Sequence, residues 1–227
     1  MKPFLSIVLP VQNEAEFVSR VIMEIEAMLT QSKIDYELVV VENGSTDESL
    51  AVLKKLALIN PRVKVGVSSP GYGRAVVYGL NQAKGEYLSY MPSDGQVDIR
   101  VIPRLVELVK TNKYDLVKVY RISRESLVRK YVSWMFNQLA KSVFGLRVKD
   151  INASPKVFKS GELRKLNLKS KDSFLDTELL IKAKKFDWKI KEVPMENLKR
   201  VGGKSTVKPK IIFEFISNIW RWHNEFK

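Results

Sequence analysis

Residues 93–96, Ser-Asp-Gly-Gln, place one carboxylate and one amide directly after a short apolar run. The run 86–91 has the composition of a buried strand, and Pro92 ends it. Asp94 and Gln96 therefore follow the carboxyl end of a strand, where open α/β sheets bind ligands. Mg²⁺ or Mn²⁺ bound to a diphosphate needs few protein oxygens and keeps coordination positions for the phosphates. Asp94 and Gln96 fit such an ion, although an ordinary polar turn after a strand explains the same residues.

Polar residues also follow two other predicted strands. Residues 10–14 come after the first strand, and Asn13 has the side chain of a helix N-cap. Residues 41–47 end the second strand, where Ser45 or Thr46 can cap the next helix. Two adjacent parallel strands that end in carboxylates and amides form a pocket able to read a base and a ribose.

Two further segments have the composition of phosphate-binding loops. Residues 71–75 combine two glycines, a helix start and one cation, Arg74. Residues 200–204 place two glycines between Arg200 and Lys204, which suits a mobile loop that closes over an anion. Each segment is also typical of a plain surface loop, so the order of all the motifs carries more information than any one of them.

The elements that must position these residues alternate along the front half of the chain. We expect strands at 4–9, 36–41, 63–67, 87–91 and 115–119, and helices at 14–31, 46–59, 73–84 and 99–112. This alternation predicts an α/β fold with a mostly parallel central sheet flanked by helices. No repeat or long linker divides the chain, so we expect one domain at 1–208, with a front half at 1–120 and a back half at 121–208.

Two amphipathic helices are expected in the back half, at 127–146 and 210–226, the latter filling a C-terminal segment at 209–227. Aromatic and aliphatic residues beside Lys and Arg are typical of a helix in a membrane interface, and packing onto the sheet or a partner subunit explains them equally. No run approaches the ~20 apolar residues of a membrane span. We therefore expect a cytoplasmic protein in peripheral contact with an anionic membrane surface. The sequence leaves a homo-oligomer open.

The net charge of +14 is unevenly distributed, with −4 in residues 1–60, +4 in 61–120 and +14 in 121–227. The basic back half favours a phosphate-bearing substrate, an anionic lipid or nucleic acid. No nucleic-acid-binding motif is present and the first third is acidic, so we expect no nucleic-acid partner. Because the chain has no cysteine, it can form neither a disulfide nor a thiolate metal site.

The series of motifs resembles the family-two glycosyltransferases, and its order looks most like the polyprenyl-phosphate sugar synthases of the dolichol-phosphate mannose synthase branch. The resemblance runs from Pro10 to about Ser205. It is carried by Pro10, Asn13 and Glu14, residues 41–47, residues 71–75 with Gly79, Ala83 and Gly85, and residues 93–96, 115–121, 149–152, 176–178, 190–194 and 200–205. It implies a GT-A-type nucleotide-binding fold, a nucleotide-diphosphate sugar donor, Mg²⁺ or Mn²⁺, and inverting transfer of a hexose to a polyprenyl phosphate.

The resemblance also implies roles for individual residues. The nucleoside pocket would be lined by Pro10, Gln12, Glu14, Val41 and Asn43; the metal would be held by Asp94 and Gln96; the donor phosphates would be met by Arg74, Arg200, Lys204 and Ser205; and the acceptor phosphate would be met by Arg121 and Arg129. A phosphate acceptor is already ionised and needs no strong base. A sugar hydroxyl would need one, and Asp176 or Glu178 are the candidates, although acids at a helix N-terminus explain both.

Three positions depart from the family pattern. Pro92 stands where the first metal carboxylate is expected, which predicts weaker metal binding and leaves a non-catalytic nucleotide-sugar sensor open. Glu42 and Asn43 replace the usual paired aspartates, and because an amide both donates and accepts, Asn43 favours uracil slightly over guanine. Gln12 replaces a frequent Tyr, which weakens the case for base stacking. The alternative function is transfer to a saccharide hydroxyl in cell-envelope polysaccharide assembly.

Overall fold

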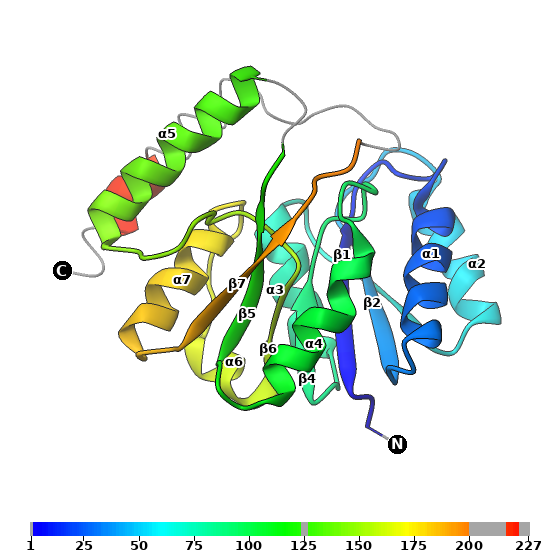
Figure 1. Cartoon of the computed structure of the whole chain (residues 1–227). Coiled ribbons are helices and arrows are strands. Elements are labelled where there is room, and N and C mark those ends of the chain that lie inside the picture. The colour runs from blue at the N-terminus through cyan, green and yellow to red at the C-terminus, as the bar shows by residue number, and fades with distance from the viewer. Residues whose placement is uncertain (1, 124–126, 200–216, 223–227) are drawn as a thin grey trace.

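The described residues form one seven-stranded sheet with helices on both faces (Figure 1). The computed structural model describes residues 2–123, 127–199 and 217–222. The strands are β1 (Leu5–Val11), β2 (Tyr36–Glu42), β3 (Val63–Val67), β4 (Tyr87–Tyr90), β5 (Leu116–Arg121), β6 (Lys156–Lys159) and β7 (Ile190–Met195). The helices are α1 (Val18–Gln31), α2 (Ser49–Ile59), α3 (Tyr72–Gln82), α4 (Ile102–Lys110) after the 3₁₀ turn η1 (Ile99–Val101), α5 (Leu127–Phe144), α6 (Ser160–Leu166) and α7 (Leu175–Lys185).

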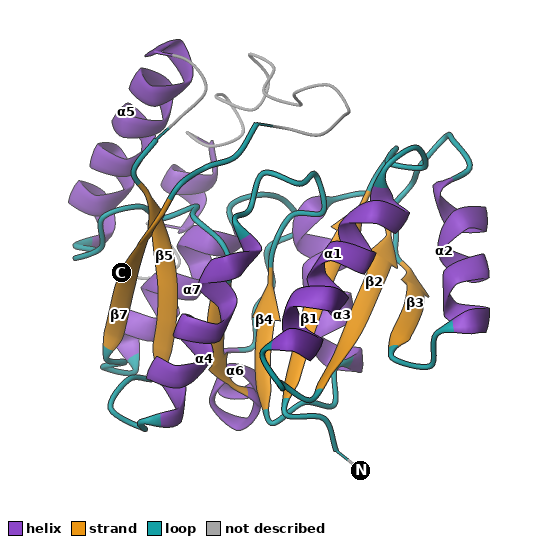
Figure 2. Ribbon diagram, turned by 45° about the vertical axis from the view of Figure 1, so that its right-hand side comes forward, coloured by secondary structure: helices purple, strands orange, loops and turns teal. Residues whose placement is uncertain are grey.

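The strand order is β3-β2-β1-β4-β6-β5-β7, and the sheet is mostly parallel as expected. Strand β1 pairs in parallel with both β2 and β4, and β5 pairs in parallel with β7. The short strand β6, which the sequence did not predict, runs antiparallel to both of its neighbours. The carboxyl ends of β1, β2 and β4 therefore lie at the same edge, which we call the upper edge of the sheet (Figure 2).

Successive side chains along each strand point to opposite faces of the sheet and fill two hydrophobic cores, one on each face. From β1, Leu5, Ile7 and Leu9 pack with α1, α2 and α4, whereas Val8 packs with α3, α6 and α7 on the other face. Because helices cover both faces, the central strands are continuous apolar runs rather than alternating ones. This explains why the sequence marks them so clearly.

Helix α5 lies beyond the upper edge and leans away from the sheet (Figures 1 and 2). Near its end, Ala140 and Phe144 are buried in the second core. Residues 217–222 are helical and dock on the same core, where the Trp222 ring stacks on Phe174 with centroids 6.0 Å apart. The rest of the expected helix 210–226, and the expected boundary at 208, lie outside the described residues. Within the described part, no helix is both long enough and apolar enough to cross a membrane.

Candidate functional site

A tight turn presents Asp94 and Gln96 directly after β4. The Asp94 carboxylate is nearly buried, and its Oδ1 accepts a hydrogen bond from the Gln96 backbone N–H at 3.1 Å. Gly95 between them has φ of 74°, a left-handed conformation that glycine adopts without strain. The turn therefore fixes the two predicted metal ligands side by side at the upper edge.

Ser93 ties this turn to the end of β1. Its Oγ donates to the Pro10 carbonyl oxygen at 2.7 Å and also contacts the Glu14 carboxylate. Pro10 in turn pairs with Val41 across β1 and β2. The structure thus brings Pro10, Glu14 and Asp94 together, as the sequence predicted for a donor site.

The Asn43 side chain joins three segments of the same edge. Its Nδ2 donates to the Val11 carbonyl at 2.9 Å, and its Oδ1 accepts from the Gly71 N–H at 3.4 Å. Gln12 Nε2 donates to the Asn43 carbonyl at 3.2 Å. Val41 is fully buried in the core beside α3. Asn43 is only 4% exposed, so its amide serves to join these backbone segments.

The polar residues after β1 and β2 bind each other instead of capping helices. Asn13 has φ of 57°, and its Oδ1 accepts from the Thr46 N–H at 2.8 Å. Asn13 N–H donates to Ser45 Oγ at 3.0 Å. Helix α1 starts later than expected, at Val18, and α2 starts after Asp47, whose Oδ1 accepts from the Ser49 N–H. The expected N-cap roles of Asn13, Ser45 and Thr46 were therefore wrong, because partners about 32 residues away outcompete the local cap.

The start of α3 is covered by the loop that precedes α7. A Cβ atom at Gly73 would lie 2.5 Å from the Ser170 carbonyl and 2.6 Å from the Asp172 carbonyl, so only glycine allows this approach. The Arg74 N–H donates to the Lys171 carbonyl at 3.3 Å. The Arg74 guanidinium is exposed and donates to the Pro70 carbonyl at 3.2 Å. Its side chain, rather than the helix N-terminus, is therefore the group that could reach a phosphate.

Asp176 lies at the start of α7, buried among a lysine and two tyrosines. Its Oδ1 accepts from Tyr90 Oη at 2.6 Å and from Lys156 Nζ at 2.5 Å. Burial lowers the pKa of Lys156, and the Asp176 charge opposes that change. Burial, followed by the charges of Asp176 and Asp94, raises the pKa of Tyr72 well above its usual value. Tyr72 thus senses both carboxylates, which links Asp176 electrostatically to the Asp94 turn.

Glu178 points into the protein and holds a loop. Its carboxylate accepts from the backbone N–H groups of Lys169 at 2.8 Å and Ser170 at 2.7 Å, and from Lys182 Nζ at 2.6 Å. The side chain is fully buried. These contacts support the loop that covers the start of α3.

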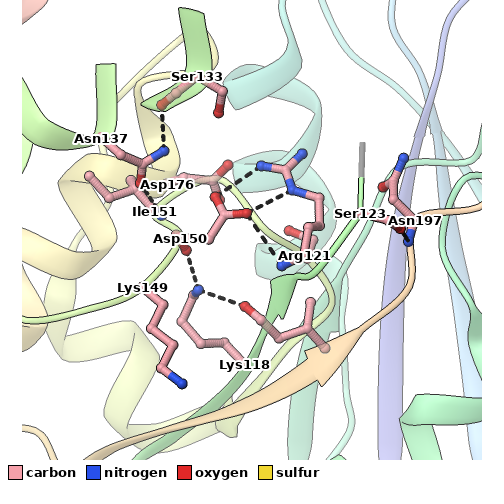
Figure 3. Close-up of polar contacts among 12 residues, drawn as sticks. Lys118, Arg121, Ser123, Ser133, Asn137, Lys149, Asp150, Ile151, Asp176 and Asn197 are labelled. Carbon is pink, nitrogen blue, oxygen red and sulfur yellow. Dashed lines mark hydrogen bonds and ion pairs between the residues drawn. The ribbon is translucent and has the colours of Figure 1, made fainter. Parts of the chain in front are cut away.

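Arg121, the last residue of β5, is held by the buried acid Asp150 (Figure 3). Its Nε and Nη2 donate to the two oxygens of Asp150 at 2.8 and 3.0 Å, a bidentate geometry. Beneath this pair, the fully buried Lys118 donates to the carbonyls of Asp150 and Val119 and to Glu192 Oε1 at 3.3 Å. Burial and then the nearby Lys156 lower the pKa of Lys118 to about 8, although Glu192 and Asp150 oppose the shift.

The chain returns to the Asp94 turn after β7. Leu198 N–H donates to the Gln96 carbonyl at 2.9 Å, and Val97 and Asn197 form an isolated antiparallel β-bridge. The predicted phosphate residues Arg200, Lys204 and Ser205 follow directly, and lie outside the described residues. Arg129 belongs to α5, and its side chain lies outside them too.

The donors at the turn suit a hard divalent ion. Asp94 and Gln96 offer carboxylate and amide oxygens, the ligand types that Mg²⁺ and Mn²⁺ take, and two protein ligands leave positions for phosphate oxygens. No group of three or more His, Asp or Glu residues suited to a metal occurs in the described ranges. The residues present therefore fit an ion shared with a diphosphate.

A comparison with protein families decides the assignment. Residues 6–167 match the family model described as glycosyl transferase family 2. The chain belongs to glycosyltransferase family 2. The expected family is thereby confirmed.

Several curated relatives of this glycosyltransferase have polyprenyl-phosphate names, as in the branch that the motif order resembles. This chain is 28% identical over 207 residues to an undecaprenyl-phosphate 4-deoxy-4-formamido-L-arabinose transferase of Edwardsiella ictaluri, and the match covers 89% of this chain and 62% of the relative. It is 28% identical over 172 residues to a dodecaprenyl-phosphate galacturonate synthase of Rhizobium johnstonii, covering 72% of this chain and 50% of the relative. The chain therefore spans between half and two thirds of the length of these two relatives.

Solved structures confirm the expected GT-A-type fold. Glucosyl-3-phosphoglycerate synthase from Mycobacterium tuberculosis, in complex with Mn²⁺, UDP-glucose and phosphoglyceric acid, has a TM-score of 0.76 and 19% identity. That match covers 98% of this chain and 80% of the other. The same enzyme with Mg²⁺ and UDP has a TM-score of 0.68 and 21% identity, covering 89% of this chain and 73% of the other.

Sequence reasoning missed the buried lysines of β5 and β6. Lys118 and Lys156 lie inside strands and have no exposed side-chain surface, yet in the sequence they read as two of many basic residues. One signal could have singled out Lys118, because a lysine between two valines in a predicted strand needs an acidic partner when it is buried. The sequence offers no means of naming that partner.

Proposed function

We propose that this glycosyltransferase moves a hexose from a nucleotide-diphosphate sugar to the phosphate of a polyprenyl phosphate, with inversion at the anomeric carbon. The observation that carries the proposal is the meeting of the Asp94 turn with the ends of β1 and β2, with Arg121 at the end of β5 on the same edge of the sheet. The names of the curated relatives support a polyprenyl phosphate as acceptor.

The donor would lie across the ends of β1, β2 and β4. We assign the nucleoside to Pro10, Gln12, Glu14, Val41 and Asn43, and Asp94 with Gln96 would hold Mg²⁺ or Mn²⁺ on the diphosphate. When bound, that ion would neutralise charge on the leaving nucleoside diphosphate. Preference for uracil stays a prediction. Calorimetry with UDP and GDP measures it, and tighter GDP binding would contradict it.

The acceptor phosphate oxygen would attack the anomeric carbon while the bond to the diphosphate oxygen breaks, leaving its electron pair on the nucleoside diphosphate. We assign the acceptor phosphate to Arg121, with Arg129. Asp150 holds the Arg121 guanidinium through Nε and Nη2, so Nη1 would be the group that meets the acceptor phosphate. Because a phosphate is ionised at neutral pH, the step needs no proton acceptor.

The buried acids of α7 would then have supporting roles. Asp176 is bound by Tyr90 and Lys156, and we assign to it the positioning of the β4 end rather than proton removal. Glu178 would keep the loop over α3 in place. If the acceptor were a sugar hydroxyl instead, Asp176 would have to serve as base, and an Asp176→Asn variant would then lose nearly all turnover.

The segment from Arg200 to Ser205 would close over the donor phosphates. The chain leads into it from Leu198, which is hydrogen-bonded to Gln96 beside the metal ligands. Arg74 would approach the same phosphates from the start of α3. We expect Arg200→Ala to lower kcat more than nucleotide affinity, because the loop would act on charge that develops during reaction. An unchanged kcat would remove this role.

Helix α5 would rest on the membrane that holds the lipid acceptor. It exposes four large apolar side chains on one face, Tyr131, Trp134, Met135 and Leu139, which are 45–61% exposed. Their spacing of three and four residues defines a stripe, and basic Lys130 and Lys141 flank it. We place this contact on the cytoplasmic face, where anionic lipids attract the basic half of the chain.

A donor screen tests the function as a whole. Purified protein with Mn²⁺ is given radiolabelled UDP- or GDP-sugars, with undecaprenyl phosphate, oligosaccharides or phosphoglyceric acid as acceptors. We expect label in the organic-extractable lipid with at least one donor. Label in the oligosaccharide would favour the saccharide-hydroxyl alternative, and nucleotide-sugar binding without any transfer would favour a sensor.

A further inference from the structure

A basic pocket lies at the lower edge of the sheet, opposite the Asp94 turn. Its volume is about 610 Å³, and it is lined by Lys2, Pro3, Lys64, Lys84, Ser160 and Arg164. These residues flank the amino ends of β1, β3 and β4 and the end of antiparallel β6, so all lie at one edge. A seven-residue strand at about 3.3 Å per residue separates this edge from the upper one.

The pocket gathers cations from four segments far apart in the sequence. Lys2 precedes β1, Lys64 lies in β3, Lys84 precedes β4 and Arg164 lies in α6. None of the six described residues that line the pocket is acidic. Lys2 and Lys84 have no ion-pair partner among the described residues, and Arg164 donates only to the Ala83 carbonyl, at 3.4 Å. An exposed lysine surface would scatter its charges, whereas these converge on one concavity.

One buried acid, Glu37, lies behind the pocket and contacts two of its lining residues, Lys64 and Lys84, without neutralising all of its cations. Its carboxylate accepts from Ser6 Oγ at 2.6 Å, from the Lys84 N–H at 2.5 Å and from Lys64 Nζ. Burial opposes its ionisation, but these hydrogen bonds together lower its pKa, so it stays charged at neutral pH. It fixes the Lys84 backbone and balances one cation, Lys64. The charges of Lys2, Lys84 and Arg164 remain for a ligand.

We propose that this pocket binds a soluble anion carrying two or more phosphate groups, such as a nucleoside di- or triphosphate. Its volume falls in the range of small-molecule sites and exceeds the needs of one phosphate. Arg164 supplies a planar fork for bidentate phosphate binding, and the lysines supply point charges. The pocket lies at the amino ends of β1, β3 and β4. Helix α5 lies beyond the opposite edge of the sheet (Figure 1), so a free anion suits the pocket better than a lipid headgroup. The inference stands independently of the function proposed above.

Calorimetry with inorganic tripolyphosphate in EDTA tests the proposal, because chelation removes the metal-dependent donor site. We expect one saturable site per chain in wild type. The double variant Lys84→Gln/Arg164→Gln should bind at least about tenfold more weakly, which corresponds to about 1.4 kcal/mol. Lys54→Gln/Lys55→Gln, which removes the same charge from the exposed face of α2, should bind within about twofold of wild type.

Three results would overturn the proposal. Equal weakening in both double variants would show diffuse attraction to a basic protein. Loss of binding in Arg121→Gln would place the anion at the upper edge. Absence of tripolyphosphate binding, with vesicles containing phosphatidylglycerol bound by wild type but not by Lys84→Gln/Arg164→Gln, would make the ligand a lipid headgroup. Thermal melting of each variant confirms its fold, and all four pocket and control side chains are exposed.

Discussion

The proposed donor side and the proposed acceptor side of the upper edge hold their polar groups by different means. Around β1, β2 and β4, the side chains of Ser93 and Asn43 bind backbone groups, with no cation in these contacts. Around β5, β6 and β7, the buried Lys118 and Lys156 pair with Glu192 and Asp176. Burying an uncharged, satisfied hydrogen bond costs little free energy, whereas burying an ion without its partner costs several kcal/mol.

This difference predicts where each half is sensitive. On the proposed donor side, Asp94 accepts a hydrogen bond from the Gln96 backbone and would hold a metal shared with a diphosphate. On the acceptor side, the buried pairs stabilise the framework that aims Arg121, so loss of one partner should act on stability before chemistry. Substitutions on the two sides should therefore separate into loss of activity and loss of folding.

Asp94→Ala is expected to have the largest effect. Transfer to lipid should fall about a thousandfold, at the upper end for loss of one group that stabilises a transition state. The unfolding temperature should stay unchanged. Asp98→Asn is the matched control, since its carboxylate lies four residues along and contacts Arg100 at 2.8 Å. Full activity in Asp94→Ala would contradict the proposal that Asp94 holds the metal on the donor diphosphate.

Lys156→Met should destabilise the fold by about 3 kcal/mol or more, because it leaves Asp176 buried without its cation. Urea unfolding measures the change. Lys165→Met is the control, because Lys165 pairs with Glu162 at an exposed site and should cost less than about 1 kcal/mol. Equal effects of the two substitutions would show that burial of the pair does not matter.

The pH dependence of the free energy of unfolding should reveal the lowered pKa of Lys118. Its folded pKa of about 8 lies below the usual value of 10.5, so between these values the unfolded chain binds more protons. The free energy of unfolding of wild type should therefore rise by about 2 kcal/mol relative to Lys118→Met as pH goes from about 8 to about 10. Urea titrations across this range test it. A constant difference between the two proteins would contradict the shifted pKa.

Trp134→Ser should have the smallest effect, a roughly fivefold loss of binding to anionic vesicles, or about 1 kcal/mol of apolar burial. Stability should not change, because the side chain is 55% exposed. Phe186→Ser, at the end of α7 and 51% exposed, is the control. Cosedimentation measures both, and equal losses would remove α5 as the specific contact.

The donor side could be predicted because its signals are local. Runs such as Leu38 to Val41 are continuous, buried and rich in β-branched residues, and each ends in polar residues that mark the sheet edge. These features gave the strands, the parallel sheet and the placement of Asp94 beside Pro10 and Glu14. Local signals failed only where a distant partner competed, as at Asn13, whose side chain binds Thr46 instead of capping α1.

The acceptor side could not be predicted in the same way, because its partners are far apart along the chain. Arg121 binds Asp150 across 29 residues, and Lys118 meets Glu192 across 74. Strand β6 is only four residues long and carries two lysines, so its pattern does not mark it as a strand. Pairing over such distances is fixed by the sheet order, which no local motif records.

A crystal soaked with UDP-sugar and Mn²⁺ tests the central assignment most directly. We expect an anomalous peak about 2.1 Å from an Asp94 carboxylate oxygen, with donor phosphate oxygens completing the coordination. A peak elsewhere, or a bound diphosphate that Asp94 does not share through the ion, would contradict the account.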